Sequence, residues 1–225
     1  GRSWISSSAG IPHSWLNTVY WTVFDPAVRG RVWAAASGTH DLPRPKMWRH
    51  TPTSSYRGGV LISSDSGVTW RPSNKGMPET AVTHIVLDLK SPPTARVLYA
   101  AAFGRGVYKS EDGGRAWVLR NTGITQKEPF AWRLSLDSAG TLYLVLARRS
   151  EKGEIGDWQD GALYRSTDAA AHWEKIQLPQ GVNGPSGLCV DARDPKRLYL
   201  AAWRRAIPGP NGGGGIWLSP DGGRN

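Results

Sequence analysis

The chain has 225 residues, of which 28 are lysine or arginine and 18 are aspartate or glutamate, so its formal net charge is +10. Hydrophobic residues make up 39%, enough to bury a sizeable core, and 12 tryptophans against 3 phenylalanines indicate that indoles fill it. The single cysteine, Cys189, excludes an internal disulfide, and we expect it to be a small buried hydrophobe. No signal peptide or membrane span is visible.

Short apolar runs rich in Val, Leu, Tyr and Trp, bounded by Gly, Pro, Asp and Asn, predict strands joined by turns, and no amphipathic helix of useful length is visible. The runs recur in a fixed order. The first type ends in Asp, which Pro follows in the first copy, at residues 19–26, 84–88, 133–137 and 187–191. The second type is at 32–36, 97–102, 142–147 and 198–202, and the third is at 60–63, 107–110, 162–166 and 215–219. A fourth strand is expected to begin at a tryptophan.

A cassette that starts with Ser, continues with Asp and Gly and ends in Trp follows each third run. Its four copies are at 64–70, 110–117, 166–173 and 219–225. The repeats between successive cassette aspartates are 47, 56 and 53 residues long, which is room for about four short strands. The sequence therefore predicts an all-β propeller with repeats at about 17–74, 75–122, 123–178 and 179–225, after a blade remnant at 1–16.

The two ends of the chain carry complementary halves of a cassette. Gly1 to Trp4 matches the back half, and Asp221 to Asn225 matches the front half without its Trp. Two interpretations follow: the chain is part of a larger propeller of six to eight blades, or Trp4 completes the last repeat and closes a four-bladed ring. We favour the larger ring, because four blades leave a narrow centre.

The cassette resembles the Asp box, or BNR repeat, of the sialidase superfamily, of sortilin-type receptors and of family 74 glycoside hydrolases. The match is nearly full at 63–70, good at 110–117 and looser at 166–173, where Ala170 replaces Gly. The resemblance implies a β-propeller in which each box is a hairpin between the third and fourth strands, away from the active face. We therefore expect structural roles for the cassette residues Asp65, Trp70, Asp112, Trp117, Asp168, Trp173 and Asp221.

Function is expected on the opposite loops, because a rigid ring presents loops that vary without harm to its core. Three connections are long, at 37–58, 148–161 and 204–214, and one is a tight turn at 103–106. Basic residues cluster in the long ones and could attract an anion. The candidate ligand-binding residues are Trp48, Arg49, Arg105, Trp132, Arg148, Arg149, Trp158 and Arg204.

Hydrolysis of a glycosidic bond needs two carboxylic groups flanking that bond. The candidates on the loop side are Asp41, Glu79, Glu128, Asp157 and Asp160, and their spacing does not single out a pair. A sialidase also needs three arginines, for which Arg49, Arg105 and Arg149 are available, but its Arg-Ile-Pro motif is absent. No His and Cys spacing suggests zinc, and no cofactor is expected.

Two functions from different classes remain. The first is a binding module that recognises a glycan or an acidic protein surface, which we favour. The second is a glycoside hydrolase similar to family 74 enzymes or sialidases. Nucleic acid is not expected as a partner, because no nucleic-acid-binding motif accompanies the positive charge. We expect an extracytoplasmic location, periplasmic or secreted.

Overall fold

The computed structural model describes residues 3–40, 42, 53–149, 154–156, 158–204 and 213–224. Within them the chain forms four antiparallel sheets and two short 3-10 helices, η1 (His13–Trp15) and η2 (Thr53–Ser55), and no α-helix. The expectation of an all-β fold built from antiparallel four-stranded sheets is confirmed, although the last sheet has only three strands.

Each sheet takes its strands in chain order. The first contains β1 (Thr18–Phe24), β2 (Val32–Ser37), β3 (Gly58–Ser63) and β4 (Arg71–Pro72). The second contains β5 (Val82–Asp88), β6 (Val97–Ala102), β7 (Gly106–Ser110) and β8 (Val118–Leu119). The third contains β9 (Ala131–Leu136), β10 (Leu142–Leu146), β11 (Ala162–Ser166) and β12 (Glu174–Ile176), and the last contains β13 (Pro185–Val190), β14 (Leu198–Ala202) and β15 (Gly215–Ser219).

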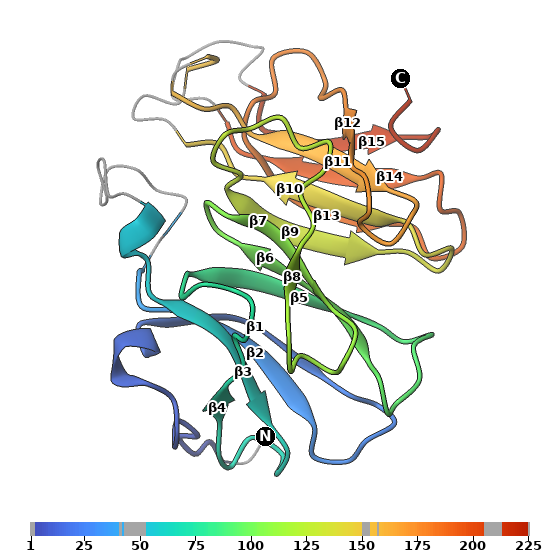
Figure 1. Cartoon of the computed structure of the whole chain (residues 1–225). Coiled ribbons are helices and arrows are strands. Elements are labelled where there is room, and N and C mark those ends of the chain that lie inside the picture. Colours follow the sequence, from blue (N-terminus) through green and yellow to red (C-terminus); the bar gives the residue numbers. More distant parts are fainter. Residues whose placement is uncertain are drawn as a thin grey trace.

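The four sheets follow one another through space as they do along the chain (Figure 1). Their first strands are neighbours, since β1 contacts β5, β5 contacts β9, and β9 contacts β13. The first sheet and the last sheet lie at opposite ends of the row, near the N and C labels of Figure 1. Trp4 is 93% exposed, and no strand pairs with the free edge of β15 within the described residues. The four-bladed closure through Trp4 is therefore not the arrangement of this structure.

The second strand of each sheet is central and carries apolar side chains toward both neighbours. In β6 and β10 nearly every residue is buried, which explains runs such as Val97–Ala102 without polar alternation. The pairing register repeats: Val32, Leu98, Leu142 and Leu198 each face the serine that opens a cassette. Residues at the same place in each repeat therefore occupy equivalent positions in the four sheets.

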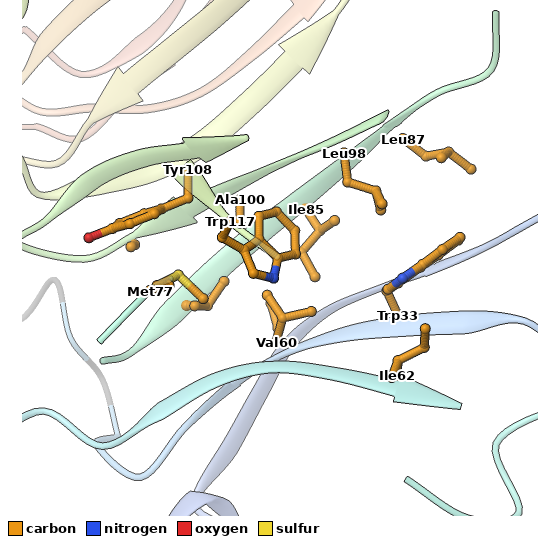
Figure 2. Packing of buried hydrophobic residues seen from close by; sticks show 13 residues of the cluster. Trp33, Val60, Ile62, Met77, Ile85, Leu87, Leu98, Ala100, Tyr108 and Trp117 are labelled. Atoms are coloured by element: carbon orange, nitrogen blue, oxygen red, sulfur yellow. The ribbon is translucent and has the colours of Figure 1, made fainter. Parts of the chain in front are cut away.

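Tryptophans fill the space between neighbouring sheets. Trp117 lies between the first two sheets among Trp33, Val60, Met77 and the other residues that Figure 2 labels. Trp173 occupies the corresponding place between the second and third sheets. The exposed fractions of Trp33, Trp117 and Trp173 are 0%, 2% and 1%. The expectation that indoles fill the core between sheets is confirmed for these three.

Trp117 and Trp173 are also hydrogen-bonded to the segment that follows the last strand of the preceding sheet. The Nε1 of Trp117 donates to the carbonyl of Ser73 at 2.7 Å, and its backbone N–H donates to that of Lys75 at 2.8 Å. Trp173 makes the same two bonds at 2.8 Å each. Those carbonyls lie three and five residues after the cassette tryptophan of the preceding sheet. We call this pair of bonds the indole latch.

The cassettes form tight hairpins stabilised by their own side chains. In all four copies the Ser hydroxyl donates to the Asp carboxylate, at 2.7 to 2.8 Å. The same hydroxyl accepts a backbone N–H four residues after the serine. The hydroxyl and backbone N–H of Thr69 and the hydroxyl of Ser63 lower the pKa of Asp65 to about 2. Ala170 occupies its Gly position with φ 66°, a conformation that favours glycine.

One expectation about the core is wrong. Cys189 is exposed rather than buried. It pairs with Tyr199 as Val86 pairs with Tyr99, and Val86 packs against the next sheet. Cys189 lies on the last described sheet, and no described sheet covers that side, so an apolar strand pattern did not lead to burial.

A buried ion pair joins the first two sheets at the end opposite the loops expected to be functional. The Arg96 guanidinium contacts both carboxylate oxygens of Asp25, at 3.0 and 2.8 Å, and the two side chains are 3% and 0% exposed. The hydrogen bond from Arg96 holds the pKa of Asp25 below its usual value, more strongly than burial raises it. Asp25 also accepts the Ala27 N–H at 3.0 Å, and Arg96 also donates to the carbonyls of Leu89 and Ser91, so both charges are enclosed by hydrogen bonds from the protein.

Replacing Trp117 by Ala should destabilise the fold strongly. Loss of a buried indole removes apolar contacts and leaves a cavity, which typically costs about 3 to 5 kcal/mol. Val118→Ala is the matched control, because Val118 is 56% exposed and its truncation should change stability by roughly 0.5 kcal/mol or less. Urea unfolding of both variants measures the difference. Equal loss in the two variants would contradict the wedge role of Trp117.

Asp25→Asn should lower the free energy of unfolding by about 3 to 5 kcal/mol, because it leaves the buried Arg96 charge without its partner. The exposed pair Asp194 and Arg197, 3.8 Å apart, provides the control: Asp194→Asn should cost less than about 1 kcal/mol.

The ion pair of Asp25 and Arg96 also predicts that the stability of the fold depends on pH. The pKa of Asp25 is lower in the folded state than its ordinary value of 3.8. Its contribution to stability is therefore present above pH 3.8 and is lost as the pH falls through the folded-state pKa. Urea midpoints between pH 7 and pH 2 should converge for wild type and Asp25→Asn at the acid end.

Candidate functional site

The connections β2–β3, β6–β7, β10–β11 and β14–β15 leave one end of the sheets, together with the links from one sheet to the next, because successive strands run antiparallel. We call this end the loop face. The cassette hairpins lie at the other end, where Ser66 and Gly113 bond to the β1–β2 turn and the β5–β6 connection. On the loop face, Phe103 and Ala147 donate backbone bonds to Ala81 and Phe130, at 2.9 and 2.8 Å. The bases of these two connections are thus hydrogen-bonded to the links between sheets.

An arginine surrounded by aromatic rings lies at the centre of the loop face. Arg149 is 0% exposed. Its guanidinium carbon lies 5.1 Å from the ring centre of Phe130, 5.2 Å from that of Trp158, 5.7 Å from that of Tyr56 and 5.9 Å from that of Phe103. The guanidinium also donates to the Tyr56 hydroxyl. Cation–π attraction in a desolvated setting explains how a charge is held there. We call these five residues the Arg149 nest.

The nest draws on three sheets. Tyr56 comes from the β2–β3 connection, Phe103 from the β6–β7 turn, and Phe130 from the link between β8 and β9. Arg149 and Trp158 both belong to the β10–β11 connection, whose two arms pair at Arg149 and Gln159. These residues are distant in sequence, so the geometry of the nest depends on the spacing of the sheets that carry them.

Trp158 forms the outer wall of the nest. Its side chain is 48% exposed, and its ring meets Phe130 edge-on at 6.3 Å. Its φ is 56°, a conformation that costs an aromatic residue energy and that structures keep where the surroundings require it. The strained backbone holds a half-exposed indole over a fixed, buried charge.

Glu128 is the carboxylate candidate beside the nest. Its Oε1 accepts a bond from the Thr53 hydroxyl at 3.3 Å, and its carbonyl accepts one from the Gln159 side chain at 2.8 Å. Burial raises the pKa of the Tyr56 phenol, and the negative charge of Glu128 raises it further, whereas Arg149 opposes both. Glu128 and Arg149 therefore act on Tyr56 with opposite sign.

Two other carboxylate candidates belong to separate groups. Asp160 accepts a bond from the Asn183 side chain at 3.0 Å and bonds from the Gly156 N–H, while Arg148 donates to Asn183 at 3.0 Å. Glu79 accepts the Trp15 indole N–H at 2.6 Å and lies 3.9 Å from Arg57. Glu79, Glu128 and Asp160 thus each have their own polar partners. Asp41 and Asp157 lie outside the described residues.

Of the remaining ligand-binding candidates, Trp132 packs against the nest. It is half-buried and meets Phe103 edge-on at 6.3 Å and Tyr20 edge-on at 5.4 Å, with the Arg133 guanidinium 4.3 Å from its ring centre. Arg105 lies in the β6–β7 turn, where its charge acts on Tyr108. Arg204 is exposed. Trp48 and Arg49 lie outside the described residues, so the expected arginine triad stays a prediction.

Sequence reasoning missed the partners that complete the nest. Tyr56, Phe103, Phe130 and Gln159 carry no motif, and the burial of Arg149 gives no local signal. Trp15 takes no part in the nest: it is 5% exposed and bonds to Glu79. The aromatic residues at the bases of the loops were the one feature of the sequence that could have indicated the nest.

Within the described ranges no group of three or more His, Cys, Asp or Glu side chains could hold a metal ion. None of the helices described is long and apolar enough to cross a membrane.

Comparison with known proteins places the fold. A xyloglucanase of Paenibacillus sp is 27% identical over 188 residues, which are 72% of this chain and 18% of that protein. Two solved structures superpose on 90% of this chain and 28% of their own: the GH74 enzyme of Niastella koreensis, at 18% identity with a TM-score of 0.60, and the GH74 xyloglucanase of Xanthomonas campestris, at 20% with 0.57. The chain has the β-propeller fold. No protein-family model matches it.

These matches cover only part of the similar proteins. The chain spans less than a third of each solved neighbour and under a fifth of the xyloglucanase. At this identity the solved neighbours establish the arrangement of the propeller's sheets and not the identity of any site residue. The loop face of the propeller therefore has to be interpreted from its own residues.

A histidine on an inner strand of the propeller gives a prediction about pH. His84 is 6% exposed, its ring lies 4.4 Å from that of Trp21, and its Nδ1 accepts the Leu134 N–H at 3.4 Å. Burial, with help from the Arg133 charge, lowers the pKa of His84 from 6.5 to about 3. His84 should stay neutral down to about pH 4, and an imidazole NMR titration measures this.

Because the folded-state pKa of His84 lies below its unfolded value, the stability that it contributes is present above pH 6.5 and is lost as the pH falls toward 3. In His84→Gln this part of the acid destabilisation should disappear. A His84 resonance that titrates near 6.5 would contradict the buried, neutral state.

Proposed function

We propose that this chain is a glycan-binding part of a β-propeller, which holds a neutral glucan-type polysaccharide on its loop face. The observation that carries the proposal is Trp158, the half-exposed indole of the Arg149 nest. Sugar rings have apolar C–H faces that pack on aromatic rings, while their hydroxyls need polar partners. An amphipathic indole next to amide and carboxylate groups meets both needs.

The construction of the site supports binding. The nest fixes Trp158 from behind through Phe130 and the Arg149 guanidinium, so little side-chain freedom is lost when a ligand packs on it. Gln159 and Asp160 follow Trp158 along the chain and are half-buried. These groups can accept or donate hydrogen bonds at the edge of a sugar ring.

The proposed ligand class rests on the sequence relative. The similar Paenibacillus protein is named a xyloglucanase, and xyloglucan is a neutral glucan. We infer the same ligand class for this chain, and with it an extracytoplasmic location where such polysaccharides occur. We also propose that the cassettes are Asp boxes, since in all four copies the Ser hydroxyl bonds to the Asp carboxylate in a hairpin remote from the loop face.

A glycoside hydrolase is the second candidate. Glu128 favours it, because this carboxylate lies at the nest, close enough to raise the pKa of Tyr56. Hydrolysis needs a second carboxylate across the scissile bond, and Glu79 and Asp160 are the described alternatives. The net charge of +10 favours a third reading, an acidic protein partner, which differs from a neutral glycan in its response to salt.

Trp158→Ala should weaken binding of xyloglucan about tenfold or more, equivalent to about 1.4 kcal/mol. Isothermal titration calorimetry with xyloglucan oligosaccharides measures the affinity. Phe24→Ala is the matched control: it removes an aromatic side chain that is 69% exposed, at the opposite end of β1, and it should leave the affinity unchanged. Thermal unfolding confirms that both variants are folded.

Three outcomes separate the candidates. Binding that persists in 0.5 M salt and depends on Trp158 supports the glycan module, whereas an interaction with acidic proteins that salt abolishes supports the third reading. Release of reducing ends that Glu128→Gln abolishes supports the hydrolase. Absence of xyloglucan binding by the wild-type chain overturns the proposed function.

A further inference from the structure

A cavity of about 410 Å³ lies between the first two sheets, at the end that carries the cassette hairpins. Its walls come from the β1–β2 turn, from β3 and β4, from the β5–β6 connection and from the second cassette. Three arginines line it: Arg31, Arg71 and Arg115. We propose that this cavity binds a tetrahedral dianion, either inorganic phosphate or the phosphate group of a small monoester. We call it the arginine cavity.

The walls of the arginine cavity are rigid. Both sheets that enclose it are four-stranded within the described residues. Ile62 forms part of the inner wall and is 8% exposed, and it belongs to the same packed cluster as Trp33 (Figure 2). The indole N–H of Trp33 donates to the Gly113 carbonyl at 3.0 Å, which holds the second cassette against the first sheet. A ligand therefore meets a preformed cavity, and little ordering accompanies binding.

Positive charge exceeds negative charge around the cavity. Asp112 is the one acidic residue among the described lining residues, so three arginines against one aspartate leave two positive charges. The Asp112 carboxylate accepts the Ser110 hydroxyl at 2.8 Å and the N–H groups of Arg115 and Ala116 at 2.8 and 2.9 Å, so it is engaged in its own hairpin. A phosphate group carries about two negative charges near neutral pH. The charge of the lining thus matches that of a phosphate dianion.

Two of the arginines have donors available for a ligand. Arg71 and Arg115 are exposed, and within the described residues the Arg71 side chain makes no hydrogen bond or ion pair. Arg115 uses its Nε to donate to the Asp112 carbonyl at 2.8 Å, which leaves its terminal nitrogens for a ligand. A guanidinium presents a planar pair of N–H groups that fits two phosphate oxygens. The hydroxyls of Ser64 and Thr94 line the same cavity and add further donors.

Arg31 contributes fixed charge from the wall. Its Nη1 donates to the Pro93 carbonyl at 2.8 Å and lies 3.4 Å from the Asp25 carboxylate. Its guanidinium carbon is 6.0 Å from the ring centre of Trp33. The Asp25 carboxylate already accepts two bonds from Arg96, so one carboxylate serves two arginines. Positive charge therefore remains in excess at this wall.

The repeats show that the propeller does not require these arginines. The position after the cassette tryptophan is occupied by Arg71, Val118 and Glu174, and the position three residues after the cassette aspartate by Val68, Arg115, Ala171 and Arg224. Of the described grooves between sheets, only the one between the first two sheets has an arginine from both positions. Unneutralised like charges repel one another and oppose folding. Ligand binding therefore explains their coincidence better than stability does.

A hollow on the second sheet provides a contrast. It has a volume of about 230 Å³ and is lined in part by Lys109 and Glu111. These two side chains form an ion pair at 2.7 Å, so the lysine charge is neutralised within the protein. The arginine cavity differs because Arg71 has no such carboxylate partner among the described residues.

Isothermal titration calorimetry with inorganic phosphate tests the proposal. At about pH 8, where phosphate is mainly a dianion, the wild-type chain should bind it with a Kd of about 1 mM or lower. Arg71→Gln and Arg115→Gln should each weaken binding about tenfold or more, because each removes a charged donor. Circular dichroism checks that both variants are folded. Absence of saturable binding by the wild type, or full affinity in both variants, overturns the proposal.

Arg29→Gln is the matched control. Arg29 is exposed in the same β1–β2 turn as Arg31 but does not line the cavity. It removes the same charge from the same end of the sheets, so it should leave the phosphate affinity unchanged. A loss equal to that of Arg71→Gln would mean attraction to the positive surface as a whole and would overturn a specific site.

A series of anions at constant ionic strength tests the selectivity. Inorganic sulfate has the shape and charge of the phosphate dianion and should bind with similar affinity, whereas acetate should bind about tenfold more weakly or less. Acetate binding as tight as that of phosphate overturns the dianion site. Glucose 6-phosphate separates the two sources: tighter binding than inorganic phosphate supports a monoester as the ligand, and weaker binding supports the free ion.

The arginine cavity is independent of the proposed glycan function, because it lies at the opposite end of the sheets from Trp158. Trp158→Ala should bind phosphate with wild-type affinity, and Arg71→Gln should bind xyloglucan with wild-type affinity. Failure of either proposal can thus be recognised without the other. Loss of phosphate binding in folded Trp158→Ala would overturn the assignment of the anion to the arginine cavity.

Discussion

The indole latch is the interaction on which the rest of the structure depends. The central strands of the first two sheets are rich in alanine, and two such sheets in contact would leave gaps at their outer edges. Trp117 and Trp173 fill those gaps, and their N–H groups are satisfied by carbonyls of the preceding sheet. Because these carbonyls lie at constant offsets along the chain, each latch sets both the distance and the register between two sheets. Gly76 and Gly123 follow the latch with positive φ, and a Cβ at either position would collide with the tryptophan carbonyl.

The spacing that the latches set is what makes the loop face chemically organised. The Arg149 nest takes one ring from each of four connections, and a guanidinium attracted by aromatic faces requires them at about 6 Å or less. The position of Trp158 over the guanidinium therefore depends on the spacing of the sheets that carry these connections. The cassettes at one end of the sheets and the nest at the other end are therefore coupled through rigid strands. This division leaves the loop sequences free to diverge while the hairpins keep the scaffold constant.

Much of the fold was predictable because its signals are local and repeated. The cassettes, the Asp-ended inner strands and the paired runs recur in one order, and β6, β10 and β14 are at the predicted residues or within one residue of them. The site was harder to predict, because contacts such as that of Tyr56 with Arg149 join residues 93 positions apart. Local pattern also misled at Cys189, whose strand resembles its buried counterparts while lying on a side that no described sheet covers. Burial of Arg149 depends on aromatic rings from other sheets, and a basic loop residue taken alone indicates exposure.

The same latch accounts for the order of the sheets. Trp70 shows that a latch forms on a short segment without a strand of its own, since Ser7 and Ala9 hold it by two bonds. The latch therefore needs only two backbone carbonyls at fixed offsets, and Trp117 and Trp173 find them just after the last strand of the preceding sheet. Because these bonds fix the register of each sheet against its neighbour, the loops of successive sheets leave on the same side, and aromatic rings from several connections can meet around Arg149.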